Sequence, residues 1–366
     1  MKKKKLLWVA HESNKSGANI AMLEFIDALT TEFDSLVVLP HEGNMQIALS
    51  ERGITSAVIY QYGWTNVYPW WNISKWGKVV LRSVHAVQQL NKVISETNPD
   101  IICTNTLVPF IGSISAKLKH KPHVWWIHEF GKEDFGFKTG WSFEKLSFRW
   151  MQKSSKLIVC NSKAIMRKFS KAMPQVNMQT VYQPVTWSVH EPVIKKEARF
   201  LMFGQIVASK GHKQVLEAMV ANRKLGKPVY SLHIKGPNEV KEYLAELRNF
   251  VRENQLEDKV VIENGYFVKE KEMPKYEALL VASRAEAFGR VIVEANKAGI
   301  PVVIRNSGGA PELVNETNGI LYDTEEELAA ILCGERSLPE GEIKFNYDEK
   351  EQIQFLSRLL HTINKA

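Results

Sequence analysis

One stretch of the sequence constrains the fold more than any other: residues 281–311, which read VASRAEAFGRVIVEANKAGIPVVIRNSGGAP. Small, acidic and turn-forming residues near its beginning predict a loop that leaves a buried strand. Apolar residues then recur at helical spacing, so we predict a helix that begins near 288–290 and is ended by Gly299. The short apolar run 302–304 is predicted to be the next buried strand.

Two carboxylates, Glu286 and Glu294, flank the start of this predicted helix and are eight residues apart. The first amides of a helix donate hydrogen bonds to an anion, while carboxylates accept them from hydroxyls. Gly308 and Gly309 then permit backbone geometry that a side chain would forbid. A phosphate joined to a polyol is the ligand that such a site suits. The alternative is a pair of surface acids around an ordinary βαβ unit.

The domain organisation follows from length and from alternating elements. A chain of 366 residues exceeds the usual size of a single hydrophobic core, so two domains are expected. Predicted strands alternate with helices in both halves, which predicts an α/β fold of two doubly wound, Rossmann-like parallel sheets facing a cleft. We predict an N-terminal domain at 1–185, a C-terminal domain at 186–347, and at 348–366 a helix that packs back toward the N-terminal domain. The strands predicted from short apolar runs include 57–60, 123–127, 157–160, 180–182, 199–203 and 230–234. Ser162 is the predicted N-cap of a helix that runs to Phe169.

The basic residues are distributed unevenly along the chain. Residues 1–185 contain 23 Lys and Arg against 13 Asp and Glu, whereas the remaining residues contain 25 against 27. The whole basic excess lies in the first half and predicts an anionic partner there: membrane lipid, nucleic acid or a phosphorylated acceptor. A solvated face that keeps the protein soluble is the competing interpretation.

Two segments of the first half, 61–82 and 135–150, combine aromatic with basic side chains. The first contains Trp64, Tyr68, Trp70, Trp71 and Trp76, followed by Lys78 and Arg82. Aromatic rings with cationic neighbours suit a lipid headgroup boundary, and they also stack on sugar rings or bases. A packed aromatic subcore under a loop is an equally strong alternative.

The cysteines and apolar runs predict a reducing compartment. Cys103, Cys160 and Cys333 form no C-x-x-C, and the first two lie in apolar runs typical of buried thiols. Such usage fits the cytoplasm. The apolar run 6–10 is too short for the core of a signal peptide, and no stretch approaches the length of a transmembrane helix. We expect a cytoplasmic protein that, where it meets a membrane, lies on the inner face.

The 281–311 stretch resembles the donor-site signature of the retaining glycosyltransferases, in particular glycosyltransferase family 4. That signature is a glutamate, a Phe-Gly turn, a second glutamate eight residues on and a Gly-Gly-x-x-Glu loop. The matching residues are Glu286, Phe288, Gly289, Glu294, Gly308, Gly309 and Glu312. The resemblance implies the two-domain GT-B fold, with a UDP-, GDP- or dTDP-linked sugar donor bound by the C-terminal half and the acceptor by the N-terminal half.

The resemblance also implies roles for individual residues. Glu286 would contact hydroxyls of the donor sugar and Glu294 those of the ribose, while the amides of 288–290 would meet the phosphate or the sugar. The other implied donor contacts are Gly17 at the diphosphate, Gly236 and Tyr266 near the nucleobase, Gln205 and Lys210 in the diphosphate loop, and Arg290 beside it. His128 would line the reacting carbon, so His128, Lys210 and Glu286 are the implied catalytic residues.

One position departs from the family pattern. The family's diphosphate loop carries an Arg and a Lys five residues apart, but in this chain Gln205 precedes Lys210. A glutamine can hydrogen-bond a phosphate but brings no charge. Arg284 and Arg290 flank Glu286 and are the candidates for the second positive charge, although each is equally well interpreted as a surface arginine.

The implied reaction is a retaining transfer that uses no metal or other cofactor. The sequence contains no Asp-x-Asp and no cluster with metal-ligand spacing. Lys210 and the helix-start amides would stabilise the leaving diphosphate, which in retaining relatives takes the acceptor's proton on the same face. No side-chain nucleophile is evident, so double displacement is less favoured. The expected acceptor is a glycan or a lipid-linked molecule, as in the synthesis of cell-surface polysaccharide or glycoconjugate.

Two other functions stay open. The first is an enzyme of the same fold with different chemistry, such as a sugar-nucleotide epimerase or a phosphorylase. The second is a non-catalytic basic module that binds a membrane or nucleic acid. The 281–311 stretch lies in the second half of the chain, away from the basic excess of residues 1–185. We therefore expect no nucleic-acid partner. A peripheral contact with an anionic membrane is expected instead.

Overall fold

Short apolar runs pair into two separate parallel sheets, each wound with helices. The computed structural model describes residues 3–63, 73–135, 141–186, 196–238 and 240–363. The chain divides into unit 1, which comprises Met1–Pro184 and Glu349–Ala366, and unit 2, which comprises Val185–Asp348. One sheet has seven strands and the other six. This confirms the predicted α/β class with two Rossmann-like parallel sheets.

The sheet of unit 1 has the order β3-β2-β1-β4-β5-β6-β7. Its strands are β1 (Lys4–Val9), β2 (Phe33–Leu39), β3 (Thr55–Val58), β4 (Ile101–Asn105), β5 (His123–Ile127), β6 (Leu157–Cys160) and β7 (Met178–Thr180). At the carboxyl end of β1, Val9 lies opposite both Val38 and Thr104. The chain order reverses between β1 and β4, and this is the edge at which doubly wound sheets bind ligands.

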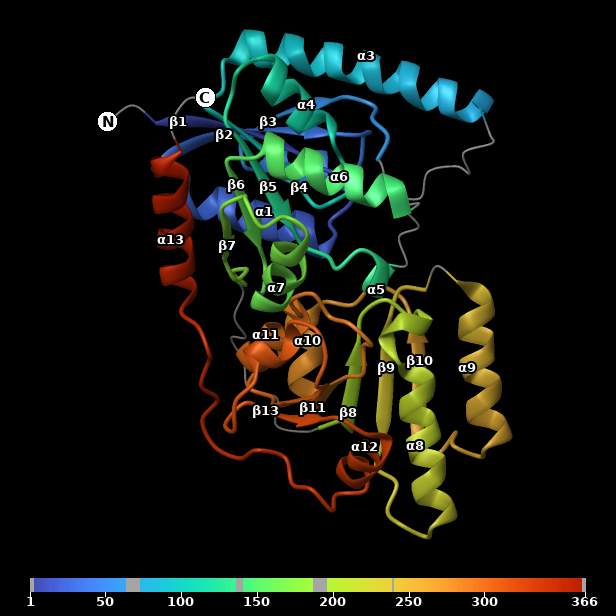
Figure 1. Ribbon diagram of the computed structural model, residues 1–366. Coiled ribbons are helices and arrows are strands. Elements are labelled where there is room, and N and C mark those ends of the chain that lie inside the picture. Colours follow the sequence, from blue (N-terminus) through green and yellow to red (C-terminus); the bar gives the residue numbers. More distant parts are fainter. Residues whose placement is uncertain (1–2, 64–72, 136–140, 187–195, 239, 364–366) are drawn as a thin grey trace. The chain divides into compact units, whose positions relative to one another are not determined.

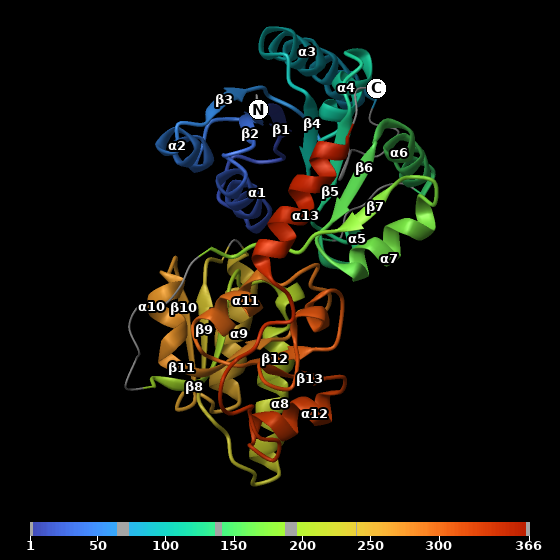
Figure 2. The same cartoon turned by 90° about the vertical axis from the view of Figure 1, so that its left-hand side faces the viewer.

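Helices cover both faces of this sheet (Figures 1 and 2). They are α1 (Gly17–Ala28), α2 (Asn44–Glu51), α3 (Ile73–Thr97), α4 (Ile111–Leu118), α5 (Lys132–Phe135), α6 (Trp141–Ser154), α7 (Lys163–Ala172) and α13 (Glu349–Thr362). One buried cluster joins α1, α2 and α13 to the sheet around Trp8, Phe25 and Trp126. A second cluster joins α3 and α4 to the opposite face. Side chains alternate along each strand, so one strand supplies both clusters.

The sheet of unit 2 repeats the same winding, in the order β10-β9-β8-β11-β12-β13. Its strands are β8 (Ala198–Phe203), β9 (Leu232–Gly236), β10 (Val260–Asn264), β11 (Tyr276–Val281), β12 (Val302–Arg305) and β13 (Gly319–Tyr322). Its helices are α8 (His212–Lys224), α9 (Lys241–Glu253), α10 (Lys269–Glu272), α11 (Arg290–Lys297) and α12 (Glu325–Leu332). A buried cluster joins α8, α9 and α12 to one face of the sheet.

Several strands differ from their predicted bounds. The observed β3, β7 and β9 occupy 55–58, 178–180 and 232–236 rather than 57–60, 180–182 and 230–234, and β13 was not predicted. A strand begins and ends where its neighbour offers a pairing partner. Thus β9 pairs with β8, and Phe200 of β8 lies opposite Leu232, the first residue of β9. As a result Gly236 is the last residue of a strand and lies directly at the ligand-binding edge.

Other predictions about local structure are confirmed. The predicted helix in the 281–311 stretch is α11, and Gly299 follows it with φ +73°. Ser162 caps α7 by accepting a hydrogen bond from the Ile165 amide at 3.2 Å. Cys103 and Cys160 are free and buried. Residues 64–72 and the side chains of 73–76 and 135–143 lie outside the described part, so the interpretation of their aromatic residues stays a prediction.

Candidate active site

The predicted donor loops of unit 2 lie at the switch point of its sheet, where the chain order reverses between β8 and β11. The loop 204–211 leaves β8, and the loop 282–289 leaves β11. The amide of Arg284 joins the two loops by donating to the Ser209 carbonyl at 3.2 Å. Ligands of doubly wound sheets bind outside the strand ends at such a point. The fold therefore places the two predicted donor loops side by side.

Two glycines allow close backbone approaches around these loops. Gly308 has φ +68°, and a Cβ on it would lie 2.4 Å from the carbonyl oxygen of Glu286. The next amide, that of Gly309, donates to the same oxygen at 2.7 Å. At the end of β9, a Cβ on Gly236 would lie 1.7 Å from the carbonyl oxygen of Gly204. A side chain at either glycine would displace the loops, so both glycines are needed for this arrangement.

An ion pair spans the switch point. Nζ of Lys210, on the β8 loop, lies 2.9 Å from Oε2 of Glu286, on the β11 loop. The lysine side chain is 38% exposed and that of the glutamate 19% exposed, so water reaches both groups. A pair this exposed contributes little to folding stability. It can open to let the cation bind a phosphate and the carboxylate bind a hydroxyl.

Glu294 lies in the second turn of α11 and is buried, with 2% of its side chain exposed. Its Oε1 is 2.6 Å from Nζ of Lys269, the first residue of α10, and 4.0 Å from Nε of Arg290. Its Oε2 is also buried and has no hydrogen-bond partner within the described residues. Buried polar atoms are normally hydrogen-bonded. The carboxylate therefore keeps one acceptor that no donor among the described residues occupies.

The predicted nucleobase region is brought together at the end of β9. The amide of Gly265 donates to the carbonyl of Gly236 at 3.1 Å, which places the following residue, Tyr266, at the same strand ends. Tyr266 is 92% exposed. Phe288, by contrast, is buried with its ring 6.2 Å from that of Tyr347, so only its backbone can meet a ligand.

The start of α11 carries the remaining predicted donor contacts. Gly289 precedes the helix with φ +95°, and Arg290 is its first residue. The Arg290 side chain is largely buried beside Glu294, whereas Arg284 is exposed and Gln205 is partly buried. The two arginines considered for the second positive charge thus lie in different surroundings, one facing solvent and one beside a carboxylate.

In unit 1, the predicted catalytic His128 directly follows β5 and is buried. Its Nδ1 lies 2.8 Å from Nε2 of Gln183, and its ring stacks on Trp126 at 5.3 Å between centroids. Its carbonyl accepts a hydrogen bond from Asn161 Nδ2 at 3.0 Å. With the Gln183 amide nitrogen as the donor, Nδ1 of His128 is the acceptor of this hydrogen bond.

A buried carboxylate lies next to this histidine. Oε2 of Glu129 accepts from the His128 amide at 3.0 Å, and Oε1 accepts from the Leu107 amide at 2.6 Å. Burial raises the pKa of Glu129 to about 7. The other predicted residue of unit 1, Gly17, is the first residue of α1 after the β1 loop. Its amide belongs to a helix N-terminus, where a phosphate is bound favourably.

Two family models match the chain, one for each unit. Residues 186–332 match Glycosyl transferases group 1, and residues 16–186 match Glycosyltransferase Family 4. Together they span most of the sequence, on two sheets of the expected winding. The chain belongs to the GT-B glycosyltransferases.

Solved structures support the same fold. The structure of Anabaena Alr3699/HepE in complex with UDP and glucose has a TM-score of 0.73 at 18% identity, covering 98% of this chain and 100% of that one. A glycosyltransferase from Rickettsia africae ESF-5 has a TM-score of 0.71 at 14% identity, covering 98% of each chain. The apo lipopolysaccharide outer core galactosyltransferase WaaB has a TM-score of 0.66 at 17% identity, covering 97% of this glycosyltransferase and 95% of that one. At these identities the likeness concerns the fold.

A curated relative matches a smaller part of the sequence. The glycosyltransferase is 36% identical over 77 residues to an uncharacterized 41.2 kDa protein in the cps region of Klebsiella pneumoniae. The match covers 20% of this chain and 21% of the relative, about a fifth of each.

Three residues at the site of this glycosyltransferase were not identified from the sequence. Lys269 lies in the run Lys-Glu-Lys-Glu, which is typical of a solvated surface. Gln183 and Glu129 have no role in the motifs described above. Lys269 and Gln183 contact predicted residues that are 25 and 55 positions away, so no local pattern could reveal them. Glu129 is next to His128 in the sequence, but its burial and its contact with the Leu107 amide appear only in the fold.

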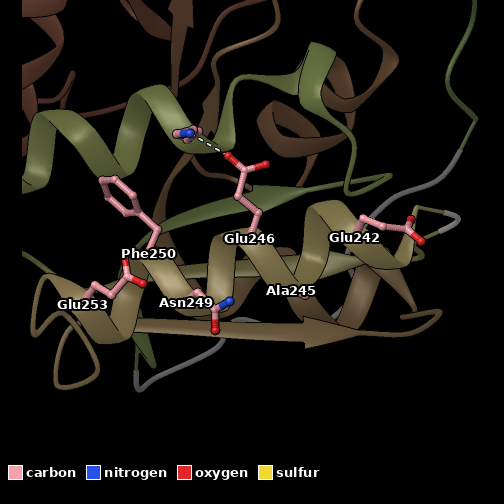
Figure 3. Close-up of a pocket in the computed structure, with 7 residues that line it drawn as sticks. Glu242, Ala245, Glu246, Asn249, Phe250 and Glu253 are labelled. Carbon is pink, nitrogen blue, oxygen red and sulfur yellow. Dashed lines mark hydrogen bonds and ion pairs between the residues drawn. The ribbon is translucent and has the colours of Figure 1, made fainter.

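A surface hollow on unit 2 lies elsewhere in the glycosyltransferase, along α9 and the first turn of α8. Its lining residues are Lys213, Glu242, Ala245, Glu246, Asn249, Phe250 and Glu253 (Figure 3). Lys213 Nζ is ion-paired with Glu246 Oε1 at 2.6 Å. None of the predicted donor residues lines this hollow, and its carboxylates would repel a diphosphate. In the part of the chain that the structure describes, no group of three or more His, Cys, Asp or Glu could hold a metal ion.

Proposed function

We propose that this glycosyltransferase moves a sugar from a UDP-linked donor to a glycan or lipid-linked acceptor with retention of configuration and without a metal ion. The observation that carries the proposal is the Lys210–Glu286 ion pair at the switch point of unit 2, at 2.9 Å, together with the buried carboxylate of Glu294 on α11. A cation and a carboxylate together suit a ligand that combines phosphate with hydroxyls.

The choice of UDP rests on the solved relatives. The HepE structures contain UDP, UDP with glucose, and UDP-glucose. The acceptor class rests on the name of WaaB, a lipopolysaccharide outer core galactosyltransferase, and on the cps region of the Klebsiella relative. These names favour the synthesis of a cell-surface polysaccharide or glycoconjugate.

The proposed donor contacts follow from the groups that each residue presents. Lys210 would bind the diphosphate, together with the amides at the start of α11, where the helix dipole favours an anion. Glu286 would accept hydrogen bonds from the donor sugar and Glu294 from the ribose. His128 would lie at the reacting carbon, held by Gln183.

The proposed chemistry needs no side-chain nucleophile. The bond between the anomeric carbon and the phosphate oxygen breaks as the acceptor oxygen bonds to the same face of that carbon. The acceptor's proton passes to the departing phosphate oxygen, so charge and atoms balance without a covalent enzyme intermediate. Lys210 stabilises the negative charge that develops on the leaving group.

The test is a thermal unfolding series with UDP-, GDP- and dTDP-sugars, followed by a turnover assay. A ligand at one hundred times its Kd stabilises the folded state by about 2.7 kcal/mol. We expect a shift with UDP-sugars and release of UDP that depends on an added acceptor. Release of UDP that needs only inorganic phosphate would instead favour a phosphorylase, and interconversion of the donor sugar would favour an epimerase.

Gln205→Arg tests how the enzyme replaces the family arginine. We expect UDP affinity to stay equal or to fall, because Arg290 or Arg284 supplies the second charge and an added cation near Lys210 is repelled. Isothermal titration calorimetry with UDP measures this, with Gln205→Met as the uncharged control of similar length. Tighter binding by the arginine variant alone would show that the site lacks a charge.

We also propose that unit 1 binds reversibly to an anionic membrane. On α3, Val80, Leu81 and Val84 are exposed, with Leu81 at 72%, and Arg82 is an exposed cation among them. Leu146 on α6 is exposed as well. Exposed apolar side chains with cationic neighbours suit a headgroup boundary. The basic excess of residues 1–185 favours anionic lipid as the partner.

Co-sedimentation with vesicles tests the membrane proposal. We expect binding to vesicles that contain phosphatidylglycerol at low salt, release at high salt, and no binding to phosphatidylcholine alone. Replacing Leu81 and Val84 by serine should weaken binding severalfold. Leu225→Ser is the matched control, since Leu225 is 70% exposed in unit 2. If the wild type stays in solution with anionic vesicles at low salt, a soluble acceptor becomes the better proposal.

A further inference from the structure

Lys269 is the cation that contacts the buried carboxylate of Glu294. Its Nζ lies 2.6 Å from Oε1, within hydrogen-bond distance, whereas Nε of Arg290 is 4.0 Å from the same oxygen. The lysine side chain is 35% exposed and the glutamate 2% exposed. Lys269 therefore reaches from the surface of α10 to a carboxylate on α11, across 25 positions of sequence.

This contact decides which carboxylate oxygen is left for a ligand. An ionised carboxylate is costly to bury unless a partner compensates it. Lys269 compensates Glu294 through Oε1 alone, and Oε2 stays buried without a hydrogen-bond partner among the described residues. A buried acceptor in a native structure normally has a donor. The geometry thus leaves one oriented acceptor, and a ligand hydroxyl is the group that it suits.

We infer that Lys269 is a positioning residue that orients Glu294 so that Oε2 accepts a hydrogen bond from a ribose hydroxyl of the donor. The inference rests on the proposed function, because it assumes that the ligand of unit 2 is a ribonucleotide. It goes beyond that proposal by assigning the recognition of ribose over deoxyribose to a residue that does not touch the nucleotide. Without Lys269 the carboxylate turns toward Arg290, and Oε2 loses its orientation.

The experiment measures affinity for UDP, 2′-deoxy-UDP and 3′-deoxy-UDP by isothermal titration calorimetry. The wild type should bind UDP roughly 10- to 100-fold more tightly than at least one deoxy analogue, the effect of one hydrogen bond to a charged group. In Lys269→Met, UDP affinity should fall to that of this analogue, while affinity for the analogue itself should hardly change. Lys269→Arg should keep most of the preference for ribose.

Lys271→Met is the matched control, because Lys271 lies on the same short helix and is exposed. It removes the same charge and should leave the preference for ribose intact. If Lys269→Met unfolds, a double variant that carries Lys269→Met and Glu294→Gln keeps the test valid. In that double variant neither position 269 nor position 294 carries a charge, so it should fold, and its preference for ribose should stay well below that of the wild type.

The outcomes separate this inference from the proposed function. If Lys269→Met keeps wild-type preference for ribose, or loses affinity equally for UDP and both analogues, the positioning role is wrong while the donor site stands. If the wild type binds UDP but does not distinguish it from either analogue, Glu294 does not contact the ribose and the inference is wrong. If the wild type does not bind UDP at all, the proposed UDP-linked donor fails first, and this inference fails with it.

Discussion

Replacing Lys210 by alanine is expected to lower kcat by roughly two to three orders of magnitude, by analogy with removing one preorganised donor from a catalytic site. Charge on the diphosphate grows as the bond to the sugar breaks, so a cation at this position acts more strongly on the transition state than on the bound donor. Donor KM should therefore change much less than kcat. Steady-state kinetics with saturating acceptor separate the two constants.

The structure supplies a close control for this variant. Lys213 lies three residues further along the chain and pairs with Glu246 on the surface at 2.6 Å. Lys213→Ala removes the same charge from the same part of unit 2 and should leave kcat within about twofold, as expected for a surface ion pair. If Lys210→Ala retained kcat and only raised KM, Lys210 would anchor the ground state and the proposed leaving-group role would be wrong.

Glu294→Ala is expected to weaken binding of the nucleotide donor by about 1.5–3 kcal/mol, the contribution of a hydrogen bond to a charged group. The carboxylate is desolvated, and its Oε2 is the acceptor that a ribose hydroxyl would occupy. Glu294→Gln keeps the shape and one carbonyl oxygen, so its loss should be smaller. Titration with UDP measures both variants.

A double-mutant cycle adds a sharper control for Glu294. Lys269 contacts the same carboxylate at 2.6 Å, so the effects of Glu294→Gln and Lys269→Met on UDP affinity should not add. The circular dichroism and thermal unfolding of each variant show whether the fold is kept. UDP affinity equal to that of the wild type in Glu294→Ala would contradict the ribose contact.

Elements with a strong local pattern were predictable from the sequence. The helix α11 and the Gly299 that ends it follow from apolar residues at helical spacing and a left-handed glycine. The strand β5 occupies 123–127 as predicted, because a buried strand of a parallel sheet is a continuous apolar run. The Ser162 cap was also predictable, because its hydrogen bond joins two residues that are only three positions apart.

Strand ends were less predictable, because they depend on the neighbouring strand. The apolar run around β9 suggested 230–234, but pairing with β8 aligns it to 232–236. This difference matters for the site, since it places Gly236 at the carboxyl edge of the sheet, against Gly204. The strand β13 was missed altogether, and its pairing with β12 is what defines it.

The sequence by itself determined the fold class and the two-sheet winding through local periodicity, and it singled out Glu286 and Glu294 through their spacing around a helix start. Lys210 became a candidate through the resemblance to the glycosyltransferase family. Only the tertiary structure decided which groups meet. Lys210 and Glu286 are 76 positions apart, and His128 and Gln183 are 55 apart. Such pairs form because parallel strands bring their carboxyl ends, and the loops that follow them, to one edge of a sheet. The order and register of the strands decide which loops become neighbours. Neither can be predicted from the residues of a single loop.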